Sequence, residues 1–136
     1  MVSRHESYLA SEVARVLRPG GTFLSQQLGG DSNGYRAALG LPAVDRRVFE
    51  PELSRAQLEA AGLRISALES VTAATTFADA GAFAYWLRAI PWLVEGFSIP
   101  AFRTELASLD ERLRTAGPLT IEEPVFYLEA GKTSHG

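Results

Sequence analysis

Hydrophobic and polar positions recur along the chain with two different periods, which predicts both helices and strands. In residues 8–18 the apolar side chains return every three or four positions, at Leu9, Val13, Val16 and Leu17. Ser3 and Glu6 have the spacing of a capping box ahead of this helix, and the Pro-Gly-Gly sequence at 19–21 cannot continue it. Residues 22–28 are short, β-tolerant and bounded by glycines, which predicts a strand followed by a loop over 29–34.

The middle of the chain predicts one short helix and two further strands. Ser54 and Gln57 have the spacing of a second capping box, so we expect a helix over 55–61 that Gly62 ends. Apolar and polar side chains alternate over 63–71, as in a strand with one buried face. We expect its partner at 125–130, with Pro124 at an edge or a strand start because proline lacks a ladder donor.

Two more helices are predicted between those last strands, over 80–90 and 101–115. The first is almost entirely apolar. The second is amphipathic, and its buried stripe comprises Phe102, Leu106, Leu109 and Leu113. Asp110 and Arg114 are four positions apart and are expected to pair on its outer face.

Composition narrows the class of protein. The 136 residues suit one domain, and 46% hydrophobic with 21% charged residues suit a folded core rather than a disordered chain. A net charge of −3 without a basic face gives no indication of nucleic acid or anionic lipid as a partner. Cysteine is absent and the charged N-terminal region is neither a signal peptide nor a membrane span, so the cytoplasm is the expected location.

Several common catalytic and metal-binding motifs are absent from the sequence. Gly29 and Gly34 have phosphate-loop spacing, but Tyr35 follows where lysine is needed. Two histidines and no cysteine make a protein-built zinc site improbable, and one of them, His135, lies in a polar tail. Neither a calcium loop nor a hydrolase nucleophile motif is complete.

The run from Arg4 to Gly30, RHESYLASEVARVLRPGGTFLSQQLGG, resembles class I S-adenosylmethionine-dependent methyltransferases of the small-molecule type. It is similar to the segment after their fourth strand, where a helix, an L-R-P-G-G turn and a G-x-F-L strand recur. Residues 56–63 (AQLEAAGL) and 76–102 (TFADAGAFAYWLRAIPWLVEGFSIPAF) resemble later parts of the family, so the resemblance covers nearly the whole chain.

The resemblance implies an α/β fold: the C-terminal half of a Rossmann-like methyltransferase sheet. About three strands are expected, over 22–28, 63–71 and 125–130, with the last antiparallel and inserted between the other two. Residues 1–136 would be a single partial domain in which 76–117 is a helical insertion. Met1-Val2 looks like the end of the fourth strand, and the family's cofactor-gripping Gly-rich turn is expected to lie outside the sequence.

The resemblance also places candidate site residues. Arg4 and His5 follow the family's fourth strand, where they would contact S-adenosylmethionine, and His5 is the candidate catalytic base. Gln26 and Gln27 lie at the carboxyl end of a predicted strand and are candidate substrate-binding residues; the alternative is that they are ordinary strand-end polar groups.

Seven of the thirteen aromatic residues fall within residues 77–102. Such a cluster can roof an apolar acceptor pocket, or it can be core packing beneath a helical insertion. Phe83, Trp86, Leu87 and Ile90 form the expected core stripe of the first helix there. Tyr85 and Trp92 are therefore the candidate substrate-lining residues.

The sequence thus favours a methyltransferase-like protein that, in full-length form, methylates a small molecule. The isolated chain is expected to bind S-adenosylmethionine weakly or not at all. Loss of the neighbours of strand 22–28 would leave an unpaired edge, so self-association is expected. The alternative function is a non-catalytic module that dimerises or binds a small ligand.

Overall fold

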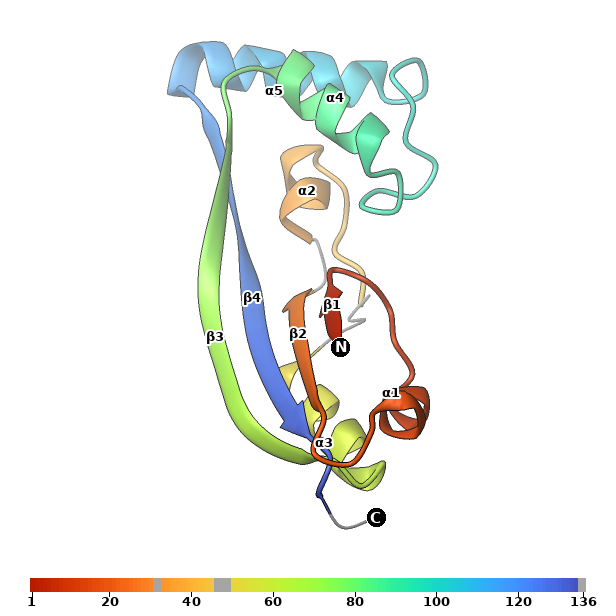
Figure 1. The fold of residues 1–136 in the computed structure, drawn as a ribbon. Helices are drawn as coiled ribbons and strands as arrows, with labels where there is room; N and C mark the ends of the chain where they lie inside the picture. The colour runs from red at the N-terminus through yellow and green to blue at the C-terminus, as the bar shows by residue number, and fades with distance from the viewer. Residues whose placement is uncertain (31–32, 46–49, 135–136) are drawn as a thin grey trace. The chain divides into compact units, whose positions relative to one another are not determined.

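The computed structural model describes residues 1–30, 33–45 and 50–134, which divide into two compact units (Figure 1). Unit 1 is formed by Met1–Gly30, Arg47–Ala73 and Pro124–Gly136, and unit 2 by Asp31–Arg46 and Ala74–Glu123. Segments distant in sequence therefore build each unit.

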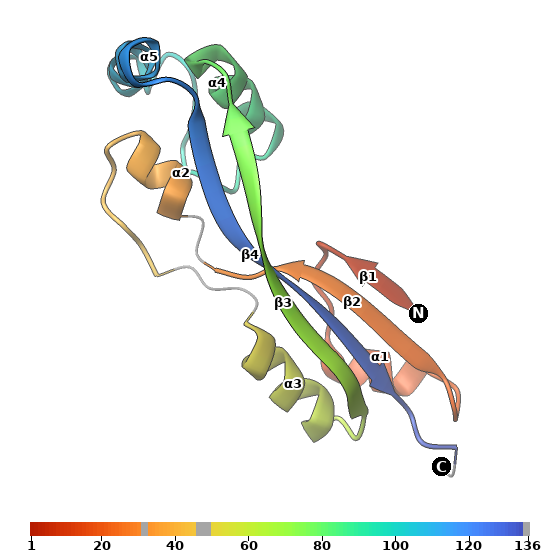
Figure 2. The same ribbon diagram turned by 90° about the vertical axis from the view of Figure 1, so that its left-hand side faces the viewer.

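The described residues form one mixed sheet with the strand order β1-β2-β4-β3. Its strands are β1 (Val2–Arg4), β2 (Thr22–Leu28), β3 (Arg64–Phe77) and β4 (Leu119–Gly131). β1 pairs with β2 in parallel, and β4 pairs with β2 antiparallel, with Ser25 opposite Leu128. The antiparallel last strand inserted between the other two is therefore confirmed, and Figure 2 shows β3 and β4 running in opposite directions.

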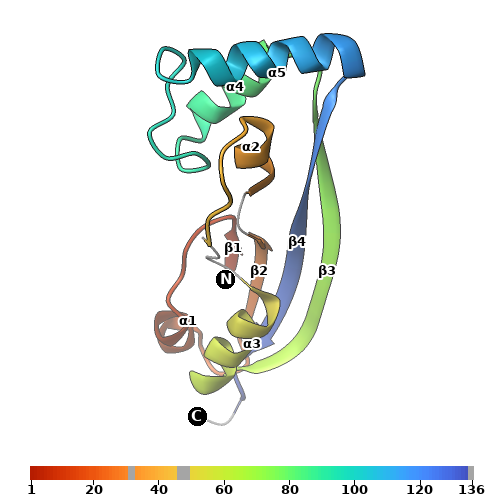
Figure 3. The same cartoon turned by 180° about the vertical axis from the view of Figure 1, so that it is seen from behind.

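Unit 1 carries the core that the strand and helix patterns predict. β2 has the predicted bounds, and Phe23, Ser25 and Gln27 are buried on one face. The helices α1 (Ala10–Val16) and α3 (Pro51–Ala60) contact each other and pack against that face (Figure 3). The buried apolar residues of this core are Val13, Leu17, Phe23, Leu58, Leu63, Phe126, Leu128 and Ala130.

Both predicted capping boxes are wrong. Ser3 lies in β1, where it pairs with Ser25, and α1 starts only after Leu9, whose side chain makes no cap hydrogen bond. Likewise α3 begins at Pro51 rather than Arg55, because proline in the first turn has a helical φ and needs no N–H partner. Ser54 is consequently buried inside the helix.

The two long strands extend beyond their predicted bounds. β3 continues to Phe77 through a run from Glu69 to Ala74 that is exposed on both faces and therefore shows no alternation. β4 begins at Leu119 and passes through Pro124, whose carbonyl accepts a hydrogen bond from the Gly29 N–H at 2.8 Å. A proline that serves only as an acceptor is compatible with a strand.

Unit 2 contains the helices α2 (Asn33–Ala38), α4 (Ala80–Ala89) and α5 (Arg103–Ala116). The last two match their predictions closely and pack together, and Asp110 pairs with Arg114 at 2.9 Å as expected. Helix α2 was not predicted; it occupies the end of the expected loop, of which Asp31 and Ser32 lie outside the described residues. Gly34 approaches β4 so closely that a Cβ there would lie 2.8 Å from Ile121 Cγ2.

Most of the clustered aromatic rings belong to the core of unit 2. Phe77, Phe83 and Trp86 make edge-to-face contacts, and Phe97 packs on Phe102 with the ring centroids 5.4 Å apart. Core packing thus accounts for these five rings. The buried stripe predicted for α4 is confirmed, with Phe83 and Leu87 fully buried.

The unpaired edge predicted on strand 22–28 is wrong. β1 covers one side of β2 and β4 covers the other, because the three residues Val2–Arg4 are enough to form a parallel ladder. The edge strands of the described sheet are instead β1 and β3.

Candidate functional site

The carboxyl ends of the parallel strands β1 and β2 meet at one edge of unit 1. Open α/β sheets bind their ligands at this kind of edge. Arg4 ends β1, and His5 and Glu6 follow it; all three side chains are exposed. The structure thus brings Arg4 and His5 together with Gln26, which pairs with Arg4 in the ladder.

His5 has an unusual backbone conformation. Its φ of 54° lies in the left-handed region, and no other described non-glycine residue has a positive φ. Its N–H donates to the Gln26 carbonyl at 2.8 Å. Residues with a Cβ adopt this conformation at an energetic cost, and such residues cluster at functional sites.

Gln27 is buried beneath this loop, with 1% of its side chain exposed. Its side-chain amide donates to the Glu6 carbonyl at 2.9 Å and to the Ser25 and Ser3 hydroxyls at 3.1 and 3.4 Å. Gln26, by contrast, is only half-buried. The two neighbouring glutamines therefore differ: only Gln27 is directed into the polar interior of unit 1.

Tyr8 extends that polar interior. Its ring meets Phe23 edge-on with centroids 5.0 Å apart, and burial raises the pKa of its phenol, while the neighbouring hydroxyls of Ser54 and Ser25 act in the opposite direction. Tyr8 also lines an open groove of about 420 Å³ between α1 and α3. The phenol is thus a protonated group in the neutral pH range.

Tyr85 and Trp92 both belong to unit 2, unlike the other candidate site residues. Their exposed fractions are 74% and 71%. Tyr85 projects from α4 away from the buried stripe of Phe83 and Leu87. Their part in substrate binding stays a prediction.

Unit 2 has a partly buried pair of titratable side chains that the sequence pattern did not reveal. The Tyr35 hydroxyl donates to Glu123 Oε2 at 3.3 Å, beneath the rings of Phe77 and Phe83. Burial, and next the charge of Glu123, raise the pKa of Tyr35 to about 12, and burial raises the pKa of Glu123. The partners are 88 positions apart in the sequence, so no local signal could identify them.

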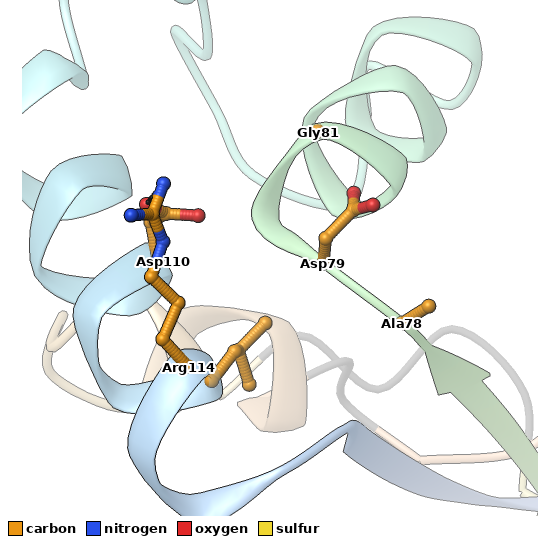
Figure 4. A pocket seen from close by; sticks show the side chains of 6 residues that line it. Ala78, Asp79, Gly81, Asp110 and Arg114 are labelled. Atoms are coloured by element: carbon orange, nitrogen blue, oxygen red, sulfur yellow. Dashed lines mark ion pairs between the residues drawn. The ribbon is translucent and has the colours of Figure 1, made fainter.

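A second open pocket, of about 430 Å³, lies between the ends of α4 and α5 (Figure 4). Asp79 lines it, but its Oδ1 accepts from the Ala82 N–H at 2.7 Å and so caps α4. Asp110 also lines it and is paired with Arg114. The pocket's carboxylates thus have structural partners within unit 2.

Two negative findings apply to residues 1–30, 33–45 and 50–134. No group of three or more His, Cys, Asp or Glu side chains there is arranged to hold a metal ion. In the same residues, no helix combines the length and the apolar character needed to cross a bilayer.

No protein-family model and no curated protein sequence matches the chain. Several solved structures do match the chain. A candidate methyltransferase from Bacillus halodurans superposes with a TM-score of 0.58 at 16% identity, over 97% of this chain and 63% of its own. A (4+2) cyclase gives a TM-score of 0.45 at 23% identity, covering 97% of this chain and 48% of its own.

A further similar structure is phosphoethanolamine N-methyltransferase 2 of Haemonchus contortus, solved with phosphomonomethylethanolamine and S-adenosylhomocysteine. Its TM-score is 0.42 at 16% identity, over 97% of this chain and 33% of its own. The chain thus spans less than two thirds of each of these proteins. Together with the strand order, the Bacillus halodurans match establishes that the chain has a methyltransferase-like α/β fold, covering part of such a protein.

Proposed function

We propose that the chain is the C-terminal part of a methyltransferase domain that transfers a methyl group from S-adenosylmethionine to a small molecule. The observation that carries the proposal is the sheet order β1-β2-β4-β3 with an antiparallel β4, in a fold that superposes on a candidate methyltransferase. Residues 1–136 would form one partial domain, with 76–117, which includes α4 and α5, as an insertion between the last two strands. The cytoplasmic location stays a prediction.

Residues at the carboxyl ends of β1 and β2 are the proposed contacts with the reacting molecules. His5 would act as the base if the acceptor is a hydroxyl or an amine, and Arg4 and His5 would contact the cofactor. Gln26 is the better placed glutamine for substrate because its side chain is half-buried rather than enclosed. Methyl transfer from a sulfonium mainly requires alignment and exclusion of water, so few acid-base groups are needed.

The polar side chains that follow β1 and β2 are too few to bind the whole of S-adenosylmethionine. Among the described residues that follow β1 and β2, Glu6 is the acidic one, and its side chain is exposed on the loop after β1. A cofactor with a ribose and an amino acid moiety needs several convergent polar groups. We therefore expect binding of S-adenosylmethionine to require additional strands.

Calorimetry with S-adenosylmethionine and the 136-residue chain tests this expectation. We expect no saturable heat at millimolar concentration, a free energy of binding weaker than about −4 kcal/mol. Saturable binding with micromolar affinity would show that the described strands are sufficient to bind the cofactor.

The DNA sequence provides a second test of the proposal. We expect the DNA upstream of the Met1 codon to encode, in frame, a Gly-rich strand-turn-helix segment. A stop codon immediately before the Met1 codon would contradict this expectation.

A second candidate function is a non-catalytic module that self-associates. The edge strand β1 favours it, because Val2 in this strand and Met1 directly before it are exposed apolar residues, as are Leu9 and Val16 elsewhere in unit 1. An unpaired edge with apolar flanks can pair with another chain. Sedimentation at increasing concentration tests this candidate: a chain that stays monomeric would contradict a self-associating module, whereas a dimer is compatible with both candidates.

A further inference from the structure

We propose that Gln27 is a positioning residue, which holds the segment 3–6 and thereby fixes the backbone of His5 in its left-handed conformation. The inference rests on the proposed function only in that His5 is taken to face the reacting molecules. Gln27 itself is enclosed within unit 1.

The contacts of the Gln27 amide identify the segment that it holds. Nε2 is 2.9 Å from the Glu6 carbonyl, 3.1 Å from Ser25 Oγ and 3.4 Å from Ser3 Oγ. The Ser3 hydroxyl donates to the same Glu6 carbonyl at 3.2 Å. One buried amide therefore joins both ends of the segment that contains His5, and its bond to Ser25 is fully buried while those to Glu6 and Ser3 are partly buried.

Two consecutive residues of β2 enclose the strained position. On the N-terminal side, the His5 N–H donates to the Gln26 carbonyl. On the C-terminal side, the Glu6 carbonyl accepts from the Gln27 side chain. A left-handed φ is unfavourable for a residue with a Cβ, so it persists only where such flanking bonds determine the backbone.

The neighbouring residue provides a matched control. Successive strand residues point to opposite faces, so Gln26 and Gln27 have the same side chain but different surroundings. Methionine has nearly the length and volume of glutamine and lacks the amide donor. Gln27→Met therefore removes the hydrogen bonds while it conserves packing, and Gln26→Met makes the same chemical change outside the network.

Nuclear magnetic resonance of the 136-residue chain tests the proposal through the hydrogen exchange of the His5 amide. In Gln27→Met we expect at least tenfold faster exchange at His5, and in Gln26→Met a rate within twofold of the wild type. A folded Gln27→Met variant with wild-type exchange at His5 would overturn the proposal.

Glycine at position 5 provides a rescue that a purely structural role of Gln27 would not show. Glycine has no Cβ penalty at positive φ. His5→Gly in the Gln27→Met background should therefore slow exchange of that amide at least threefold relative to Gln27→Met alone. An unchanged rate would contradict the positioning role.

Gln27→Glu serves if Gln27→Met does not fold. The introduced carboxyl donates to the Glu6 carbonyl only when protonated, so protection of the His5 amide, corrected for intrinsic exchange, should rise as the pH falls. Protection that is independent of pH would overturn the proposal. These experiments contain no methyl donor, so their failure and a failure of the proposed function are separate results.

Discussion

At the scale of single residues, the Lys132 ammonium joins the end of β4 to α1 through two long-range hydrogen bonds. It donates to the carbonyls of Ala14 and Leu17 at 2.6 and 2.9 Å, at the C-terminus of α1. A cation at this end satisfies carbonyls without helical partners and interacts favourably with the helix dipole. Lys132→Met should lower the free energy of unfolding by about 1–3 kcal/mol.

Urea unfolding monitored by circular dichroism measures this loss. Arg18→Met is the control, because Arg18 is a nearby exposed cation, and we expect it to change stability by less than about 0.5 kcal/mol. Equal effects of the two substitutions would mean that net charge, rather than the cap on α1, determines the loss.

Tyr35 predicts a pH dependence at the same scale. Its pKa rises from 10.0 to about 12 on folding, so between these values the folded state retains a proton that the unfolded state has lost. The contribution of Tyr35 to the free energy of unfolding should therefore be fully present below pH 10 and should decrease as the pH rises towards 12. In Tyr35→Phe this fall should be shallower, and the tyrosinate absorbance at 295 nm should lose its highest-pH component.

The exposed Tyr85 provides the control for that titration. Tyr85→Phe leaves the partly buried pair of Tyr35 and Glu123 intact, so the fall of stability at high pH should persist. If Tyr85→Phe rather than Tyr35→Phe removed the highest-pH absorbance, the assignment of the raised pKa to Tyr35 would be incorrect.

At the scale of elements, the sequence predicted those whose signal is local. β2 is bounded by glycines, α4 is an almost entirely apolar run and α5 has an amphipathic stripe, and their predicted bounds differ little from the observed ones. The capping boxes failed because Ser3 is used in a ladder and Pro51 starts α3 one turn early. Long-range pairing determined the first outcome and the exposed extension of β3, whereas the start of α3 is a local effect of Pro51.

The candidate site was predictable to the same extent. The resemblance placed Arg4 and His5, and the end of a predicted strand placed Gln26. The structure brings these residues together at the carboxyl ends of β1 and β2. The different surroundings of Gln27 depend on segment 3–6 folding over it, which is a contact across more than twenty residues. Local pattern carries no information of that kind.

The end of α3 offers a test at this scale. Gly62 follows the helix with a φ of 87°, and no atom lies within 4 Å of a Cβ built there. Gly62→Ala should therefore destabilise unit 1 through backbone strain alone, by about 1–2 kcal/mol. Gly131→Ala, at a glycine without positive φ, should cost less, and thermal unfolding of the two variants compares them directly.

At the scale of the whole molecule, the sheet has an edge at β1 and another at β3. β1 is the shorter edge and carries Val2, which is 73% exposed, whereas Val71 in β3 is 65% exposed. The chain spans only part of the Bacillus halodurans protein on which it superposes. The remaining part of a protein of that length could pair with one of the two edge strands. The exposed apolar residues Met1, Val2 and Leu9 favour β1 as the edge at which another chain pairs.

Self-association of the chain should therefore be more sensitive to a charge in β1 than in β3. A lysine on an edge strand disfavours pairing because two copies would bring like charges together. We expect Val2→Lys to weaken dimerisation at least tenfold, a loss of about 1.4 kcal/mol, and Val71→Lys to change it less than threefold. Sedimentation velocity at several concentrations measures both constants. The reverse order would place the pairing edge on β3, and a wild-type chain that stays monomeric at high concentration would contradict pairing at either edge.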